Sequence, residues 1–279
     1  MVDSALTTTE HSRDSAGMHY VYPVVSRRAG GVSIGVNLNP NNACNWRCIY
    51  CQVPNLTLGT APPIDLTLLE KELKDFLHGL QHGEFMQRIS PKARRINDIA
   101  LSGNGEPTSA AEFVQVIELV GRLKPDGLKL VLITNGSLLQ RSNVQQGLRR
   151  MAQLNGEVWF KLDRASEAGM AIINNTKITM DQVRQNLATA IACCPNTWLQ
   201  TCWFALDGIA PCKQDEDEYL DLLRGVMRDG IKPQGVLLYG LARPSLQPEA
   251  TRLSPLSHLQ LEQFARRIRA LGIVVKTAD

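Results

Sequence analysis

Short apolar segments alternate with longer segments of helical periodicity, and this alternation constrains the fold more than any other feature of the sequence. The apolar segments are near-continuous runs, which is typical of parallel strands that are covered on both faces. The alternation predicts an α/β fold with right-handed crossovers and a parallel sheet, either open and doubly wound or curved into a full or partial barrel. The predicted strands are residues 32–36, 98–102, 129–134, 157–162, 198–205 and 234–238.

An amphipathic stretch follows each of these strands. In the first stretch, residues 66–80, apolar residues recur at helical spacing, and Asp65 or Thr67 can serve as the N-cap. Six βα units are too few for a full eight-stranded barrel. Because parallel α/β folds bind ligands at the carboxyl ends of their strands, the residues directly after each strand are the first candidates for a functional site. The other predicted helices are residues 111–123, 144–154, 180–192, 216–228 and 259–271.

The composition indicates the class of protein. Hydrophobic residues make up 44% of the 279 residues and charged residues 20%, which is ordinary for a globular protein, and no apolar run approaches the roughly 20 residues that cross a bilayer. A formal net charge of +3 does not by itself indicate a nucleic-acid binder. Residues 1–17 are polar and lack the features of a secretory signal, so we expect a cytoplasmic protein without a membrane segment. We predict a disordered tail over residues 1–22 and a single domain over residues 23–279.

Three cysteines are clustered directly after the first predicted strand. Cys44, Cys48 and Cys51 form a CxxxCxxC motif within NPNNACNWRCIYCQVP, residues 39–54. Thiolates hold iron–sulfur clusters, and three ligands leave one iron of a 4Fe-4S cluster open to bind a further molecule. A structural zinc site is the alternative, but it normally has four ligands, and none of the five histidines lies in this segment. The motif therefore favours a 4Fe-4S cluster.

This motif resembles that of the radical S-adenosylmethionine (SAM) superfamily, and the resemblance spans roughly residues 24–275. It implies a partial (βα)6 barrel of the TIM type. It also implies that the methionine amino and carboxylate groups of SAM chelate the open iron. One electron then cleaves SAM to a 5′-deoxyadenosyl radical that abstracts hydrogen from a substrate. Tyr50, just before the last cysteine, corresponds to the aromatic position near the adenine, with core packing as the alternative.

A turn of small residues follows the second predicted strand. It contains Gly103, Asn104, Gly105, Glu106 and Pro107. Glycines allow a close backbone approach to a ligand. The turn resembles the Gly-Gly-Glu-Pro motif of the superfamily, from which Asn104 departs, and this resemblance implies SAM binding. We expect Glu106 to hold local backbone more often than it touches the cofactor, and an ordinary strand-to-helix turn is the alternative.

Polar residues also end the third and fourth predicted strands. Thr134 and Asn135 end the third, and Lys161 and Asp163 end the fourth. Similar positions in the superfamily contact the ribose or methionine part of SAM, so these residues are predicted to bind the cofactor. A common loop is the alternative for the first pair, and a simple ion pair is the alternative for the second. Gln200 and Thr201 on the fifth strand are fainter candidates.

The four remaining cysteines could ligate an auxiliary cluster, as in some superfamily members. Cys202, however, lies in an apolar strand where a buried thiol is common, and Cys193 with Cys194 closes a predicted helix. The fourth is Cys212.

The substrate is the least defined feature. Residues 25–40 resemble a branch related to the tRNA wyosine synthases, whose second cluster uses cysteines before the CxxxCxxC motif. This chain has no cysteine before Cys44, which argues against the wyosine reaction itself. A nucleoside or tRNA, or alternatively a peptide, protein or small metabolite, is expected as the substrate. Arg27 and Arg28 are candidates to bind a carboxylate or phosphate.

The resemblance implies a reductase such as flavodoxin or ferredoxin as the electron donor. No catalytic residue of this chain can be named from its sequence. A non-catalytic iron–sulfur or zinc protein that binds a partner through the same loop is the alternative of another class.

Overall fold

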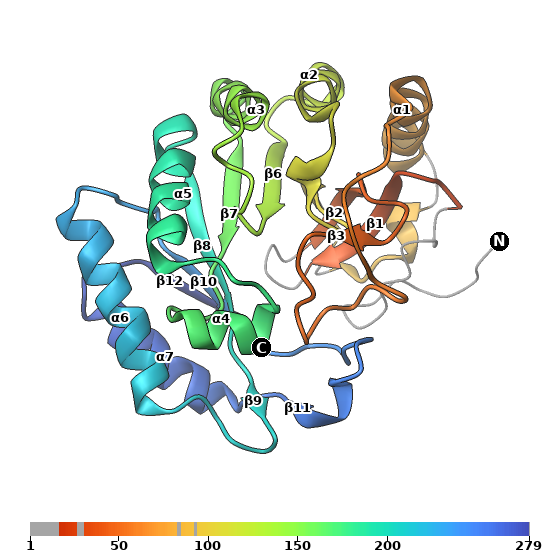
Figure 1. Cartoon of the computed structure of the whole chain (residues 1–279). Helices are drawn as coiled ribbons and strands as arrows, with labels where there is room; N and C mark the ends of the chain where they lie inside the picture. Colours follow the sequence, from red (N-terminus) through yellow and green to blue (C-terminus); the bar gives the residue numbers. More distant parts are fainter. Residues whose placement is uncertain (1–16, 27–30, 83–84, 92–93, 279) are drawn as a thin grey trace.

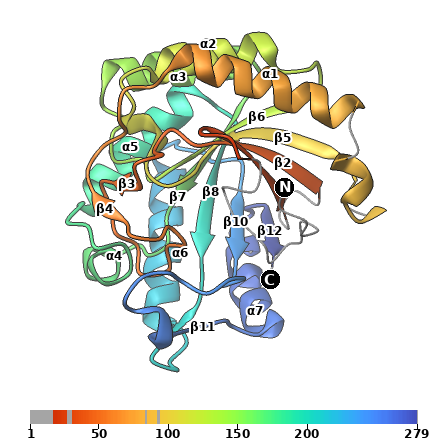
Figure 2. The ribbon, with the colours of Figure 1, turned by 90° about the vertical axis from the view of Figure 1, so that its right-hand side faces the viewer.

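The computed structural model describes residues 17–26, 31–82, 85–91 and 94–278, and its central feature is a curved sheet (Figures 1 and 2). The strand order is β1-β2-β5-β6-β7-β8-β10-β12. β1 is antiparallel to β2, and every other neighbouring pair is parallel. The strands are β1 Val21–Ser26, β2 Gly31–Val36, β5 Ile96–Leu101, β6 Lys129–Thr134, β7 Glu157–Lys161, β8 Thr197–Cys202, β10 Val236–Tyr239 and β12 Val275–Ala278.

Helices cover the outer, convex face of this sheet, and the concave face forms the lumen of an open half-barrel (Figure 2). The predicted partial (βα)6 barrel is therefore confirmed. The helices are α1 Leu66–His82, α2 Phe113–Leu123, α3 Ser142–Gln153, α4 Glu167–Asn174, α5 Met180–Cys193, α6 Lys213–Arg228 and α7 His258–Arg269. Two small ribbons complete the fold, namely β3 Ala43–Cys44 with β4 Thr57–Leu58, and β9 Ala205–Leu206 with β11 Leu253–Ser254.

Side chains pack on both faces of the sheet, and the two packing layers differ in size. The large core lies between the sheet and the helices. A small apolar cluster, built from Ala100, Val131, Trp159, Trp198 and Leu237, lies on the concave face. The concave face becomes polar toward the carboxyl ends of the strands, where a ligand site is expected.

The six predicted strands and six predicted helices are present, but β1, β12 and α4 were not predicted. β1 and β12 are the edge strands, and α4 is only 8 residues long, which is too short for a repeating apolar pattern. The predicted strand 198–205 ends at Cys202, and a separate ribbon strand follows. Within the described ranges, no helix combines the length and the apolar character needed to cross a bilayer.

A carboxylate anchors the chain just before β1. Tyr20 is buried, and its amide donates a hydrogen bond to Glu72 Oε2 at 2.8 Å. The predicted tail, residues 1–22, thus ends inside β1. Residues 1–16 lie outside the described residues, as do Arg27 and Arg28, the candidate anion-binding pair.

Two glycines within helices differ in the space that a side chain would have. A Cβ atom at Gly147 in α3 would lie 2.6 Å from the Phe113 ring of α2, whereas one at Gly79 in α1 would meet nothing within 4 Å. Gly147→Ala should lower the free energy of unfolding by about 1–3 kcal/mol through overpacking. Gly79→Ala should raise it by about 0.5–1 kcal/mol, because alanine loses less backbone entropy in a helix. Urea unfolding of both variants checks this, and equal shifts would contradict the α2–α3 packing.

Candidate functional site

A pocket of about 300 Å³ opens at the carboxyl ends of the strands. Its walls come from the barrel lumen, from the cysteine loop (residues 39–54) and from residues 239–243 after β10. Pro107, Thr134 and Asp163, in contrast, do not line it. The predicted site residues that line it are Cys44, Cys48, Tyr50, Cys51, Gly103, Asn104, Gly105, Glu106, Asn135 and Lys161.

The cysteine loop presents three free thiols to this pocket. Cys44, Cys48 and Cys51 are partly exposed, and none of them forms a disulfide. This donor set, three thiols on one loop in one pocket, fits a 4Fe-4S cluster that keeps one iron open. Among the described residues, no three Cys, His, Asp or Glu side chains converge closely enough to hold a metal ion, so the structure shows the donor residues and not a ligand geometry.

The cysteine loop has little regular structure and is held by contacts from distant parts of the chain. Its Ile49 amide donates to the carbonyl of Ile173 in α4 at 2.9 Å, and Asn175 Nδ2 donates to the carbonyl of Arg47 at 2.8 Å. Arg47 also forms a two-bond ion pair with Glu249, at 2.7 and 2.9 Å. The end of α4 and the chain after β10 therefore fix the loop from two sides.

Residues 243–249, which we name the strap, satisfy the carbonyl groups of this loop. Ser245 Oγ donates to the carbonyl of Ile49 at 2.7 Å and to that of Cys51 at 3.1 Å. Gln247 Nε2 donates to the carbonyl of Val53 at 2.9 Å. The Leu246 amide donates to the Cys51 carbonyl at 2.9 Å. The backbone around the third cysteine is thus fixed by residues almost 200 positions later in the chain.

The turn at residues 103–107 packs directly against the cysteine loop. A Cβ atom at Gly105 would lie 2.0 Å from the carbonyl oxygen of Ala43, next to the first cysteine. Gly103 has a φ of 149°, and a Cβ atom there would lie 2.3 Å from Asn37 Oδ1. Asn104 Nδ2 donates to Asn42 Oδ1 at 2.6 Å. The glycines therefore permit close approach of the turn to the cysteine loop, in addition to lining the pocket.

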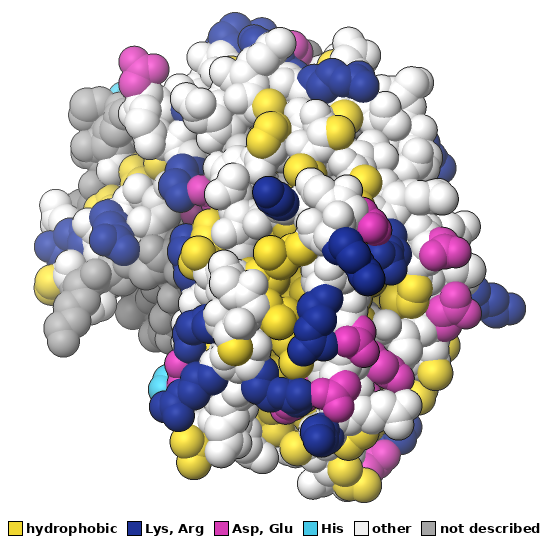
Figure 3. Space-filling view, turned by 90° about the vertical axis from the view of Figure 1, so that its left-hand side faces the viewer, with side chains coloured by type: hydrophobic (Ala, Val, Ile, Leu, Met, Phe, Trp, Pro, Cys, Tyr) yellow, Lys and Arg dark blue, Asp and Glu magenta, His cyan; other side chains and the backbone are white. Residues whose placement is uncertain are grey.

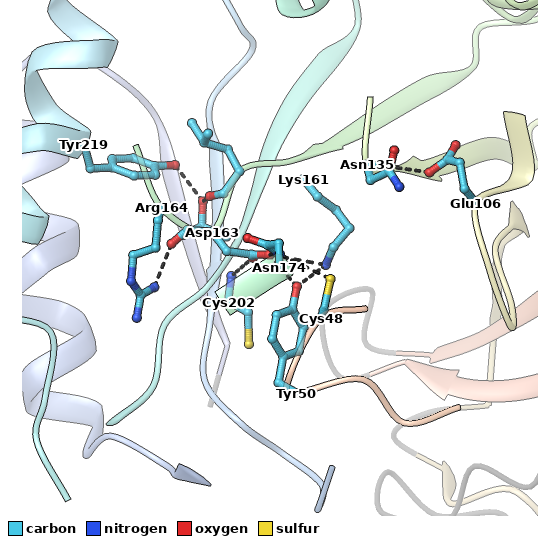
Figure 4. Close-up of polar contacts among 12 residues, drawn as sticks. Cys48, Tyr50, Glu106, Asn135, Lys161, Asp163, Arg164, Asn174, Cys202 and Tyr219 are labelled. Atoms are coloured by element: carbon cyan, nitrogen blue, oxygen red, sulfur yellow. Dashed lines mark hydrogen bonds and ion pairs between the residues drawn. The ribbon is translucent and has the colours of Figure 1, made fainter. Parts of the chain in front are cut away.

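Glu106 holds backbone, as expected from the sequence. Its buried carboxylate accepts hydrogen bonds from the Thr108 amide at 3.1 Å and from Thr108 Oγ1 and Thr134 Oγ1 at 2.6 Å each. It also accepts from the Asn135 amide at 2.7 Å (Figure 4). Burial raises the pKa of Glu106, although these hydrogen bonds oppose the rise. Asn135 Nδ2 in turn donates to Asn45 Oδ1 of the cysteine loop at 2.8 Å. Glu106 and Thr134 thus orient Asn135, which lines the pocket.

A second buried carboxylate connects the fourth parallel strand to the cysteine loop (Figure 4). Asp163 Oδ2 accepts from Tyr50 Oη at 2.5 Å and from Asn174 Nδ2 at 2.7 Å, and lies 3.9 Å from Lys161 Nζ. Lys161 Nζ also donates to Tyr50 Oη. Asn174 Nδ2 lies 3.2 Å from Cys48 Sγ. The predicted residues Tyr50, Lys161 and Asp163 therefore form one network that reaches the second cysteine.

Burial and neighbouring charges shift the pKa values of the groups in and around this network. Burial lowers the pKa of Lys161, but the adjacent Asp163 carboxylate, together with Tyr239, Cys48 and Cys202, raises it above its ordinary value. Burial and the same carboxylate raise the pKa of Tyr50, which keeps its hydroxyl protonated as a donor. Burial also raises the pKa of the Cys44 and Cys48 thiols to about 12, so the ligand-free thiols are neutral.

Comparison with known proteins supports the fold that the motifs indicate. No family model matches the chain. A UPF0026 protein of Helicobacter pylori is 33% identical over 130 residues, which make up 46% of this chain and 38% of that protein. The match thus covers well under two thirds of this curated relative's length.

Solved structures cover more of the chain at low identity. Streptococcus suis SuiB bound to S-adenosylmethionine matches with a TM-score of 0.55 and 13% identity over 90% of this chain and 50% of SuiB. TYW1 with a lysine-pyruvate adduct bound matches with a TM-score of 0.53 and 14% identity over 94% of this chain and 78% of TYW1. Coproporphyrinogen III oxidase from Escherichia coli, described as a radical SAM enzyme, matches with a TM-score of 0.50 and 12% identity over 95% of this chain and 61% of the oxidase. The chain has the radical SAM fold.

Within this radical SAM fold, the structure adds residues that the sequence did not indicate. Asn174 was missed because α4 itself was not predicted. Ser245 and Gln247 were also missed. They follow the predicted strand 234–238, so the rule that ligands bind at the carboxyl ends of parallel strands could have indicated this segment. The residues flanking the first cysteine, Asn42 and Asn45, are polar loop positions with no distinguishing spacing.

The other four cysteines lie at three separate places in the fold. Cys193 and Cys194 are buried at the end of α5, and Cys212 is exposed at the start of α6. Cys202 is buried on the pocket wall. No metal-binding group is formed by these cysteines in the described part of the chain.

Removing the charge of Asp163 should destabilise the protein. Asp163→Asn leaves Lys161 buried without its counter-charge, and we expect the free energy of unfolding to fall by about 3–5 kcal/mol. The control is Asp75→Asn, which breaks the exposed Lys71–Asp75 pair and should cost less than about 1 kcal/mol. Urea unfolding monitored by circular dichroism measures both, and similar losses in the two variants would show that the buried pair contributes nothing special.

Proposed function

We propose that this chain is a radical SAM enzyme that holds a 4Fe-4S cluster with Cys44, Cys48 and Cys51. The observation that carries the proposal is that three free thiols of a CxxxCxxC loop line one pocket at the carboxyl ends of the strands in this fold. When bound, the cluster supplies the electron that cleaves SAM to a 5′-deoxyadenosyl radical, which abstracts hydrogen from the substrate.

The predicted cofactor residues divide into two groups by their place at the pocket. Gly103, Asn104, Gly105, Asn135 and Lys161, together with Tyr50, line the pocket, and we assign them direct contacts with SAM. The remaining residues orient this wall from behind. Glu106 also lines the pocket, but its carboxylate already accepts four hydrogen bonds from the protein. Pro107 begins the following 3₁₀ turn, and Thr134 and Asp163 lie outside the lining.

The proposed partners follow from the chemistry. A one-electron donor of the flavodoxin or ferredoxin type would reduce the cluster. A nucleoside or RNA base is the proposed substrate class, and a peptide, protein or small metabolite is the alternative. Figure 3 shows Lys and Arg side chains interspersed with Asp and Glu on one face of the molecule, without the continuous basic stripe of a phosphate-backbone site.

Substituting the ligand cysteines tests the proposal. Cys44→Ala, Cys48→Ala and Cys51→Ala should each abolish iron incorporation after anaerobic reconstitution, and with it the formation of 5′-deoxyadenosine from SAM in the presence of dithionite. Cys202→Ala, also on the pocket wall, should retain about four irons per chain. Iron and sulfide analysis with chromatography of 5′-deoxyadenosine measures this. Full iron in any of the first three variants would refute the ligand assignment. Zinc in place of iron, or a cluster that does not cleave SAM, would support a non-catalytic binding protein.

The strap gives a second test. Gln247→Leu removes the hydrogen bond to the Val53 carbonyl and loosens the Cys51 backbone, so the cluster should bleach faster on exposure to air. Leu246→Ala, a change at a side chain that is 56% exposed, should bleach at the wild-type rate. Absorbance near the cluster band is followed over time after mixing with air. Identical decay in Gln247→Leu and wild type would mean that the strap does not stabilise the cluster site.

A further inference from the structure

Gln200, which lines the pocket, carries a buried polar atom without a partner among the described residues. The residue is 1% exposed, and its Oε1 has no hydrogen-bond partner among the described residues. Leaving a buried acceptor unpaired is unfavourable, since it loses its hydrogen bonds to water without replacement. The next residue, Thr201, shows the usual outcome, because its Oγ1 donates to the Leu162 carbonyl at 2.8 Å and lies 2.6 Å from Tyr219 Oη. A buried amide oxygen without a partner, such as Gln200 Oε1 in this pocket, therefore indicates a ligand.

The position of Gln200 separates it from the cysteine end of the pocket. Gln200 lies opposite Lys161 in the β7–β8 register, two residues before Cys202 at the end of β8. On β8 it therefore lies two residues further into the barrel than Cys202, whose amide binds Asp163. The walls around it are mostly apolar, because Ala100, Ile133 and Trp159 also line the pocket. A ligand that reaches Gln200 therefore extends into the lumen beyond the level of Cys202, and this is where we place the substrate.

The chemistry of a glutamine side chain restricts this ligand. A primary carboxamide carries a donor and an acceptor on the same edge. It is matched by a group that also offers N–H and C=O side by side, which is the edge of a lactam ring or of a nucleobase. A peptide bond is almost always trans, so its N–H and C=O point in opposite directions and cannot both face one carboxamide. The neighbouring Trp159 adds a flat apolar surface suited to a flat ring.

We propose that Gln200 binds the lactam edge of a heterocyclic substrate, such as a nucleobase, in the lumen beside Trp159. This inference rests on the proposed function for the identity of the substrate site. The ring would lie in the lumen with its polar edge on β8, and its other end would extend toward the cysteine loop. A free nucleoside and a base within RNA share this chemistry, and the experiment separates them.

The first measurement concerns stability and needs neither cluster nor substrate. Gln200→Met keeps the length of the side chain but removes the orphan amide, so the Tm of the ligand-free chain should stay the same or rise. The neighbouring control Thr201→Val removes satisfied hydrogen bonds and should lower the Tm. If Gln200→Met lowers the Tm as much as Thr201→Val, then the amide is satisfied by water or protein in the resting state and the proposal is wrong.

The second measurement is calorimetric binding to the reconstituted full chain. Uridine and inosine are compared with 3-methyluridine and 1-methylinosine, which lack the lactam N–H, and with unfractionated tRNA. A parent nucleoside should bind about 10-fold or more tightly than its methylated form, and Gln200→Met should remove this difference. Binding of tRNA alone, weakened in Gln200→Met, would assign the base to RNA. Binding that does not depend on Gln200, or no binding of any of these ligands, would overturn the proposal.

These results are independent of the proposed reaction. Iron content in Gln200→Met should equal that of the wild type, because the proposed ligands are Cys44, Cys48 and Cys51 and Gln200 Oε1 has no hydrogen-bond partner among the described residues. If the wild-type chain fails to incorporate iron, the proposed function is contradicted. The Tm comparison can still be interpreted in that case, because it needs no cluster.

Discussion

Asp163 is the buried charge on which the carboxyl end of the sheet depends. A carboxylate taken out of water costs several kcal/mol unless it is paired and hydrogen-bonded. Asp163 meets both conditions, since it accepts from Tyr50, from Asn174 and from the Cys202 amide at 2.9 Å, with Lys161 as its counter-charge. These partners come from the cysteine loop, α4, β8 and β7. One side chain thus fixes the relative positions of four segments that surround the pocket.

Glu106 does the same on the neighbouring side of the pocket. Its carboxylate joins the turn after β5 to the end of β6, and Asn135 extends this link to Asn45 in the cysteine loop. The cysteine loop has only the 2-residue strand Ala43–Cys44 and its ribbon partner as regular structure. Its shape is therefore set by side chains from the surrounding sheet and by the strap. This arrangement provides a preorganised surface in which the three thiols face one pocket.

Much of the fold could be predicted because the inner strands are near-continuous apolar runs and the helices are long. The edge strands β1 and β12 and the short α4 gave no comparable signal. In the site, the sequence pointed to the three cysteines and to the polar residues after three strands. It could not show that Gly105 makes room for Ala43, or that Lys161 is both an ion-pair partner and a pocket residue. Contacts such as Ser245 with Ile49 join residues far apart in the chain, and no local pattern encodes them.

The most direct test of the cluster and its open iron is electron paramagnetic resonance of the reconstituted, dithionite-reduced chain with and without SAM. The account predicts a 4Fe-4S signal whose g-values shift when SAM is added, with hyperfine coupling to a ¹⁷O-labelled methionine carboxylate, since three thiolates leave one iron able to bind SAM. A cluster signal that SAM leaves unchanged, with no coupling to the label, would contradict it.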